Sequence, residues 1–188
     1  MAEPAKKAAI YEDLDALPEN MTGEIIDGEL IATPRPSRKH IYATSVLGVR
    51  LGPSYHFGEG GPGGWIILIE PELSLGEHIL VPDLAGWKKE RVAGLGMVEE
   101  SWIPVAPDWV CEVLSPGTAR LDKTRKMPIY ARHAVPYLWL IDPVVRTLDV
   151  FSLESGRWTV LGSYAEDDRV RAEPFPEVEL HLMDLWWE

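Results

Sequence analysis

Two acidic residues lie in stretches of sequence that otherwise look like buried strands. Asp83 occurs in ILVPDLAGW and Glu112 in WVCEVLSP, and each is bracketed by apolar residues. A buried carboxylate must be hydrogen-bonded, paired with a cation or bound to a metal, because an unsatisfied charge is costly in an apolar interior. If the two strands are neighbours, both side chains converge at one end of a sheet. Oxygen ligands of this kind suit Mg²⁺ or Mn²⁺, which need few protein carboxylates.

A structural role is the alternative for these two acids. Each would then cap the end of a strand or pair with an arginine, and for a single acid in an apolar run this is the commoner case. Two such acids followed by a basic segment bring the structural and the functional interpretation close to balance.

The basic segment SPGTARLDKTRKMPIYARH follows the second acidic strand. Lys126 lies four residues before Tyr130, and Lys123 lies one turn before Lys126. A lysine on a helix here can hold or help deprotonate an attacking water and neutralise developing negative charge. The alternative is a solvated basic face. Because Pro128 is accommodated only in a first helical turn, we expect the regular helix to begin near Thr124 or later.

A β-hairpin and a helix are expected in the first third of the chain. Residues 23–34, GEIIDGELIATP, have apolar residues on both sides of an Asp-Gly pair, which supplies the positive φ angles of a tight turn. Ser37 is placed to cap a helix that runs to about Leu51 and stops at Gly52. His40 lies on the apolar face of this helix.

Further strand signals follow, and a helix-like pattern over residues 122–133 interrupts them. The expected strand segments are 65–70, 71–75, 78–87, 108–116, 137–142 and 147–153. This order predicts an α/β fold with a mixed β-sheet flanked by helices and an N-terminal β-hairpin. We expect residues 1–10 to form a loose tail and residues 11–188 to form one domain.

The composition is that of a globular chain. Of the 188 residues, 46% are hydrophobic and eight are Trp, which is enough for a packed core. No apolar run reaches the roughly 18–20 residues that span a bilayer, and the N-terminus lacks the apolar stretch of a signal peptide. Cys111 is the only cysteine, so no intramolecular disulfide can form. We therefore expect a cytoplasmic protein without a membrane partner.

The formal net charge of −12 argues at first against a polyanionic partner. More than half of the Lys and Arg residues, however, fall in three short stretches, at 35–39, 88–91 and 120–132. This segregation allows a locally positive cleft.

Several blocks of the sequence occur together in a characteristic order. They are GEIIDGEL with PRPSRKH, VPDLAGW, PDWVCEVLSPGT, LDKTRKMPIYARHAVPYLWLIDP and RTLDVFSL, and they span roughly residues 22–153. In this combination the chain resembles the Uma-two family of restriction-endonuclease-like proteins, within the PD-(D/E)XK nuclease superfamily. The resemblance implies a restriction endonuclease-like core.

The resemblance also implies roles for individual residues. Asp83 matches the superfamily's aspartate and Glu112 its second acid, and both would bind the metal. In the standard pattern a lysine lies two positions beyond the second acid, where this chain has Leu114. The resemblance implies that in this family the lysine lies on the following helix instead. That points to Lys126, with Lys123 in reserve and as a contact to substrate.

Two earlier residues complete the implied site. Glu24 matches the family's early acidic position, as a third contributor to metal or water binding, and His40 matches its helix-borne histidine, at the substrate. The alternatives are a hairpin residue facing solvent for Glu24 and a histidine satisfied by the hairpin for His40. Glu70 and Glu72 are left outside the site, because acids on edge strands usually stay hydrated.

The expected function is that of a metal-dependent endonuclease that hydrolyses phosphodiester bonds with Mg²⁺ or Mn²⁺. Its expected substrate is nucleic acid, in particular DNA, and a homodimer is an option because nucleases that cut both strands often pair two sites. A second hypothesis is a nuclease-fold module that binds nucleic acid or protein without cutting, and a third is a metal hydrolase with a non-nucleic substrate. ATP use and Ser-His-Asp catalysis are unsupported, because neither motif is present.

Overall fold

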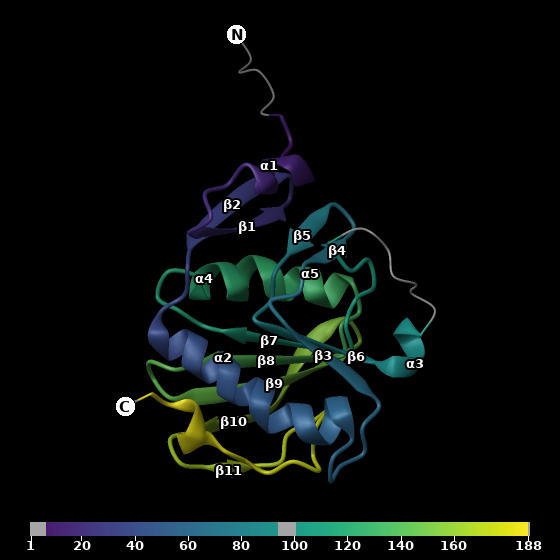
Figure 1. The fold of residues 1–188 in the computed structure, drawn as a ribbon, viewed down its shortest axis with the longest axis vertical. Coiled ribbons are helices and arrows are strands. Elements are labelled where there is room, and N and C mark those ends of the chain that lie inside the picture. Colours follow the sequence, from purple (N-terminus) through teal and green to yellow (C-terminus); the bar gives the residue numbers. More distant parts are fainter. Residues whose placement is uncertain (1–6, 94–100, 188) are drawn as a thin grey trace.

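A six-stranded sheet forms the centre of the molecule in the computed structural model, which describes residues 7–93 and 101–187. Its strand order is β10-β9-β8-β7-β6-β3 (Figure 1). The strands are β3 (Trp65–Ile69), β6 (Leu84–Lys88), β7 (Trp109–Val113), β8 (Tyr137–Asp142), β9 (Thr147–Glu154) and β10 (Arg157–Ala165). Only the β7–β8 pair is parallel, so the sheet is mixed, as predicted.

The parallel pair determines where the basic segment goes. Two parallel neighbours cannot be joined by a hairpin and need a crossover, which is usually helical. Here the crossover consists of α4 (Ala119–Leu121), the π-helix η2 (Asp122–Lys126) and α5 (Met127–Arg132). It packs on one face of the sheet, whereas α2 (Arg38–Leu51) covers the other face (Figure 1).

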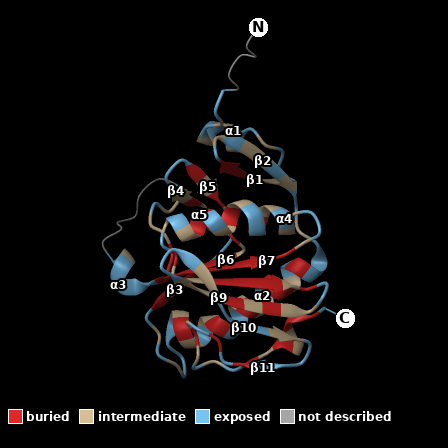
Figure 2. Cartoon of the chain, turned by 180° about the vertical axis from the view of Figure 1, so that it is seen from behind, coloured by how far each residue is buried: buried red, intermediate tan, exposed pale blue. Residues whose placement is uncertain are grey.

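Side-chain alternation along β7 sends its residues to the two faces in turn. Cys111 belongs to the hydrophobic cluster that includes α2, whereas Val110 belongs to the cluster that includes α5. Glu112 therefore emerges on the face covered by the crossover helix. All five residues of β7 are buried, and buried positions run along the central strands and the inner side of α2 (Figure 2).

The predicted N-terminal hairpin is confirmed. It forms one edge of a four-stranded sheet with order β2-β1-β5-β4, in which the strands are β1 (Met21–Ile26), β2 (Glu29–Pro34), β4 (Leu73–Leu75) and β5 (His78–Leu80). Its turn residues Asp27 and Gly28 both have positive φ, 52° and 71°. A short helix, α1 (Tyr11–Asp15), precedes it. Of the expected tail, residues 1–6 lie outside the described residues, and Ala9 N donates a hydrogen bond to Gly28 O.

The expected continuous strand 78–87 is wrong. The structure breaks it into β5 and β6, which belong to different sheets, and leaves Val81, Pro82 and Asp83 between them. Pro82 has no N–H to donate to a sheet ladder, so the chain changes sheets at this residue. Asp83 consequently lies immediately before a strand of the central sheet instead of within one.

Two helix boundaries also differ from expectation. The helix after Ser37 does not stop at Gly52 but continues as the π-helix η1 (Gly52–Phe57) and ends at Gly58, whose φ is 78°. The crossover becomes helical at Ala119, before Thr124. Its turn widens where Met127 N donates to Asp122 O, and this wider turn accommodates the proline ring one residue later.

The C-terminal residues pack against the α2 side of the central sheet. They contain β11 (Arg169–Val170), β12 (Leu180–His181) and the 3₁₀-helix η3 (Leu182–Leu185). Elsewhere in the chain, the short helix α3 (Lys89–Val92) follows β6. Phe175 is 1% exposed and meets Trp65, Trp109 and Trp139 edge-on, with ring centroids 4.9–5.7 Å away. Among the described helices, none is both long and apolar enough to cross a bilayer.

Candidate active site

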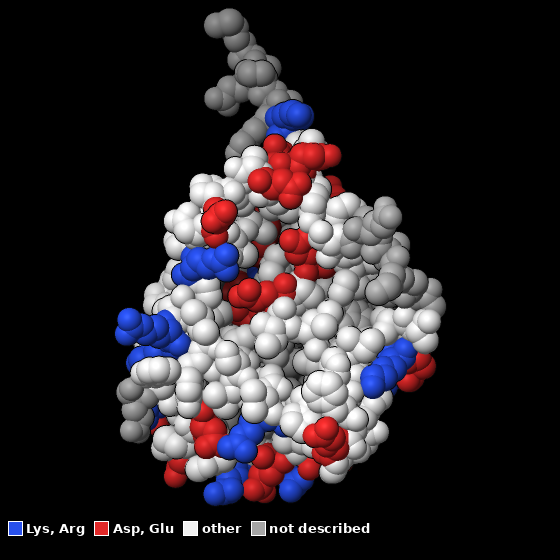
Figure 3. Space-filling view, viewed as in Figure 1, with Lys and Arg blue, Asp and Glu red and all other residues white. Residues whose placement is uncertain are grey.

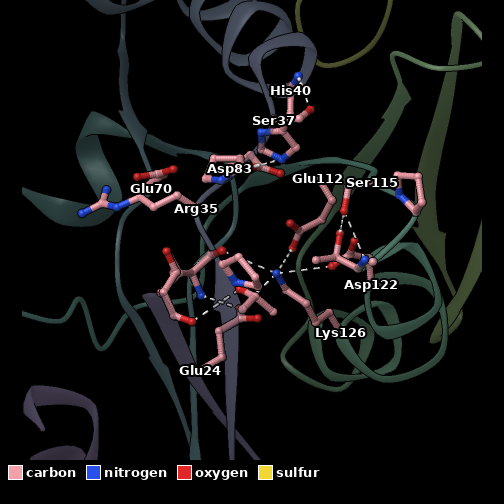
Figure 4. A pocket seen from close by; sticks show the side chains of 18 residues that line it. Glu24, Arg35, Ser37, His40, Glu70, Asp83, Glu112, Ser115, Asp122 and Lys126 are labelled. Atoms are coloured by element: carbon pink, nitrogen blue, oxygen red, sulfur yellow. Dashed lines mark hydrogen bonds and ion pairs between the residues drawn. The ribbon is translucent and has the colours of Figure 1, made fainter. Parts of the chain in front are cut away.

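A pocket of about 310 Å³ opens where the hairpin sheet, the N-terminus of α2 and the crossover helix meet. Figure 4 shows it from close by, and the predicted residues in its lining are Glu24, His40, Asp83, Glu112 and Lys126. Glu24 comes from the hairpin, His40 from α2 and Asp83 from the link between β5 and β6. Glu112 comes from β7 and Lys126 from η2. Five segments that are distant in sequence thus share one cavity.

The ammonium group of Lys126 stands at the centre of a buried group of carboxylates. Its Nζ lies 2.8 Å from Glu112 Oε1, 3.0 Å from Glu24 Oε1 and 3.6 Å from Asp122 Oδ1. The lysine is 3% exposed and Glu112 is 2% exposed. At this depth solvent screens the charges little, so the contacts are strong.

Burial and charge act in opposite directions on this lysine. Burial alone lowers its pKa, but the charges of Glu112 and Glu24 outweigh burial and hold the pKa of Lys126 well above its ordinary value. The side chain therefore stays protonated. In that state it serves as a fixed positive charge and does not accept a proton from water.

The carboxyl groups around it outnumber the single ammonium. Burial raises the pKa of Glu112 well above its usual value even though Lys126 opposes this, and burial also raises the pKa of Asp122. Glu24 and Asp83 line the same pocket. This excess of carboxyl groups, all of them oxygen donors, fits a hard divalent cation such as Mg²⁺ or Mn²⁺, which would favour their charged forms.

Asp83 is held by two donors. Its Oδ2 accepts a 2.6 Å hydrogen bond from Val113 N, and its Oδ1 lies 3.0 Å from His40 Nε2. Burial lowers the pKa of His40, but the hydrogen bond and the charge of Asp83 raise it above its ordinary value overall. His40 Nδ1 is buried and has no partner among the described residues. The contact of His40 Nε2 is thus with Asp83, and not with the hairpin as the alternative has it.

Glu24 points inward from β1. It is 7% exposed, and its Oε1 accepts a 2.8 Å hydrogen bond from Val81 N as well as the contact from Lys126. This arrangement disagrees with the alternative of a hairpin residue that faces solvent. Arg125 fastens the hairpin to the crossover helix, because its guanidinium lies 2.9 Å from Glu29 Oε2 and 3.2 Å from Asp27 Oδ2.

The three expected metal ligands do not form a closed set of oxygens. In the described residues, one group has all its ligand atoms within 4.8 Å of one another, and it is Asp27, Glu77 and His78, away from this pocket. There Asp27 is already paired with Arg125, and His78 Nδ1 accepts a hydrogen bond from Asp27 N. In the pocket, Lys126 stands between Glu24 and Glu112.

Two residues considered from the sequence lie outside the pocket. Lys123 is exposed and does not line it. Leu114, at the position of the superfamily's usual lysine, is 3% exposed and packs in the hydrophobic cluster that includes α5.

The site contains further residues to which the sequence alone assigns no role. Asp122 and Tyr130 lie four residues before and after Lys126, and this helical spacing was the available signal. Glu70, which is expected to stay hydrated outside the site, also lines the pocket, and it is exposed with a φ of 49°. Arg35 lines the pocket as well. Acidic side chains gather around the hollow in Figure 3, which makes its mouth negative.

The chain has relatives over almost its whole length. Residues 10–183 match the family described as Uma2, putative restriction endonuclease. The chain is also similar to the crystal structure of a putative nuclease belonging to DUF820 from Anabaena variabilis ATCC 29413, with 26% sequence identity and a TM-score of 0.69. That likeness covers 93% of this chain and 96% of the other. No curated protein matches.

Proposed function

The chain belongs to the Uma2 family of putative restriction endonucleases, and we propose on this premise that it is an endonuclease that hydrolyses phosphodiester bonds in DNA with Mg²⁺ or Mn²⁺. The observation that carries the proposal is the surplus of buried carboxylates around Lys126 in a pocket open to solvent. Such a surplus is costly unless a cation offsets it.

Asp83 and Glu112 are the proposed metal ligands, with Glu24 as a third contributor. When bound, a divalent ion polarises a phosphoryl oxygen and lowers the pKa of a bound water. Asp83 is oriented for this role by Val113 N and by His40, so we assign His40 to holding the aspartate.

Lys126 supplies positive charge to the reaction. Because its pKa is raised, the ammonium stays charged and can stabilise negative charge that builds up on the phosphate. Lys123 lies exposed on the same helix, where its proposed contact to substrate would fall outside the pocket. The lysine within the pocket is therefore assigned the catalytic role.

Cleavage of supercoiled plasmid DNA tests the proposal. The wild-type protein should nick the plasmid in Mg²⁺ or Mn²⁺ and stop when EDTA is added. Asp83→Asn and Glu112→Gln should both be inactive yet fold normally by circular dichroism. Glu177→Gln is the matched control, because Glu177 accepts a hydrogen bond from Tyr55 and does not line this pocket. Retained activity in Asp83→Asn or Glu112→Gln contradicts the proposal.

A binding module that does not cut is the second candidate function. The net charge of −12 and the acidic mouth of the pocket favour such a module with a protein partner, since both weaken the approach of a polyanion such as DNA. Titration calorimetry with Mn²⁺ separates the two candidates. The endonuclease requires Mn²⁺ binding that Asp83→Asn removes, whereas the binding module requires no metal affinity at this site.

A further inference from the structure

Tyr130 makes a contact that the proposed function does not use. Its hydroxyl donates a 2.6 Å hydrogen bond to Glu112 Oε1, the same oxygen that lies 2.8 Å from Lys126 Nζ. Tyr130 and Lys126 are four residues apart on the crossover helix, so both side chains reach Glu112 from one side. Two donors therefore converge on one oxygen of a buried carboxylate.

The other oxygen of Glu112 is left available. Among residues 7–93 and 101–187, Glu112 Oε2 has no hydrogen-bond partner, and it is not one of the fully enclosed unsatisfied atoms. Glu112 lines the pocket. Since Oε1 is occupied by the tyrosine and the lysine, Oε2 is the oxygen presented to the cavity.

We propose that Tyr130 is a positioning residue that, together with Lys126, fixes the orientation of Glu112 and so determines how tightly the pocket binds a divalent cation. This inference rests on the proposed function, because it assumes that Glu112 is a metal ligand. It adds a residue that acts through Glu112 and does not itself contact the cation or the substrate.

The surroundings of Tyr130 suit this role. The side chain is 0% exposed and packs in the hydrophobic cluster that includes Ile129 and Val110, so its ring has little freedom to turn. Its hydroxyl is the donor to the Glu112 carboxyl group, because that oxygen is its hydrogen-bond partner. A hydrogen bond to a ligating carboxylate is the kind of contact that orients metal ligands in proteins.

The chain offers a matched control for a test of this inference. Tyr55 is 2% exposed and its hydroxyl also contacts a carboxylate, that of Glu177, but Tyr55 does not line the pocket. Tyr130→Phe and Tyr55→Phe therefore remove the same chemical group from comparable buried positions. Only the first change affects Glu112.

Titration calorimetry with Mn²⁺ alone, without DNA, is the experiment. Tyr130→Phe should weaken Mn²⁺ binding about tenfold or more, as is typical for partners of metal ligands, whereas Tyr55→Phe should change it less than about twofold. A urea unfolding curve for each variant shows that it is folded during the titration. As a second measurement, Tyr130→Phe should need more Mn²⁺ for half-maximal plasmid nicking but should recover wild-type rate at saturating Mn²⁺.

Failure of the inference and failure of the proposed function give different results. If Tyr130→Phe binds Mn²⁺ as tightly as wild type while Asp83→Asn does not bind it, the inference is overturned and the proposed function stands. Equal weakening in the two phenylalanine variants also overturns the inference, because a general loss of stability would then explain both. If the wild-type protein binds no Mn²⁺, the proposed function fails and the inference fails with it.

Discussion

The Nζ atom of Lys126 lies 2.8 Å from Oε1 of Glu112, and both side chains are almost completely removed from solvent. Removal of two charges from water is costly, so a buried pair of this kind is a weak source of stability in itself. Removal of one partner is a different matter, because the other charge is then left uncompensated. The first prediction follows from this asymmetry.

Replacement of Lys126 with Met should lower the free energy of unfolding by about 3–5 kcal/mol in EDTA, because Glu112 and Glu24 lose their cation. Urea unfolding measures the loss. Arg146→Met is the control, since the exposed Arg146–Glu166 pair should contribute less than about 1 kcal/mol. In the double variant Lys126→Met/Glu112→Gln the loss should be smaller than the sum of the single losses. Additive losses would show that the two residues are not coupled.

His40 should be replaceable by glutamine but not by leucine. Glutamine can still donate an N–H to Asp83 Oδ1, whereas leucine cannot, and the aspartate then loses one of its two donors. We expect His40→Leu to weaken Mn²⁺ binding about tenfold or more and His40→Gln to weaken it less. Calorimetry with Mn²⁺ measures both. Equal affinities of the two variants would argue that the histidine has only a packing role.

The chemistry of the site was accessible from the sequence to the extent that it depends on local context. Apolar residues around Asp83 and Glu112 predict burial, which is complete for Glu112 and partial for Asp83, and the spacing around Lys126 predicts a helix. The break at Pro82 is also predictable from the sequence, because a proline has no N–H to donate to a β-ladder. The apolar residues around it nevertheless favour one continuous strand.

Tertiary placement was not accessible in the same way. The contact between Glu24 and Lys126 joins the hairpin to the crossover helix, and no local pattern encodes that distance. The position of Glu70 in the lining of the pocket depends on its positive φ at the end of β3. A glutamate in the sequence does not predict a positive φ. The widened turn before Pro128 likewise reflects a compromise between the proline ring and a helix held down by packing on the sheet.

Phe175 should be essential for the stability of the α2 side of the molecule. Its ring fills the space among Trp65, Trp109 and Trp139, so Phe175→Ala should lower the free energy of unfolding by about 3–5 kcal/mol. Phe57 is 71% exposed, and Phe57→Ala should change the stability by no more than about 0.5 kcal/mol. Urea unfolding compares the two. A small effect of Phe175→Ala would mean that the C-terminal segment contributes little to the core.

The free energy of unfolding should fall at acid pH, in part because of His133. Burial, with smaller contributions from the charges of His78 and Arg132, lowers the pKa of His133 below its ordinary value of 6.5. The folded protein therefore disfavours protonation of this histidine. Its contribution to stability is present above pH 6.5 and is lost as the pH falls through the lowered pKa.

His133→Asn should make the unfolding free energy less dependent on pH below 6.5. The change is small, because His133 is only partly buried. Urea unfolding at a series of pH values for wild type and variant measures it. If the two proteins give the same dependence of the unfolding free energy on pH, His133 does not contribute to it.

Lys126 comes from the crossover helix and not from the strand that carries Glu112. The charged groups of the pocket therefore come together only when the chain is completely folded. Hairpin, central strand and crossover must all be docked before acids and ammonium come together. A nascent or partly opened chain has the sheet residues but not the assembled charges. Under the proposed function, hydrolysis would then require the completely folded protein.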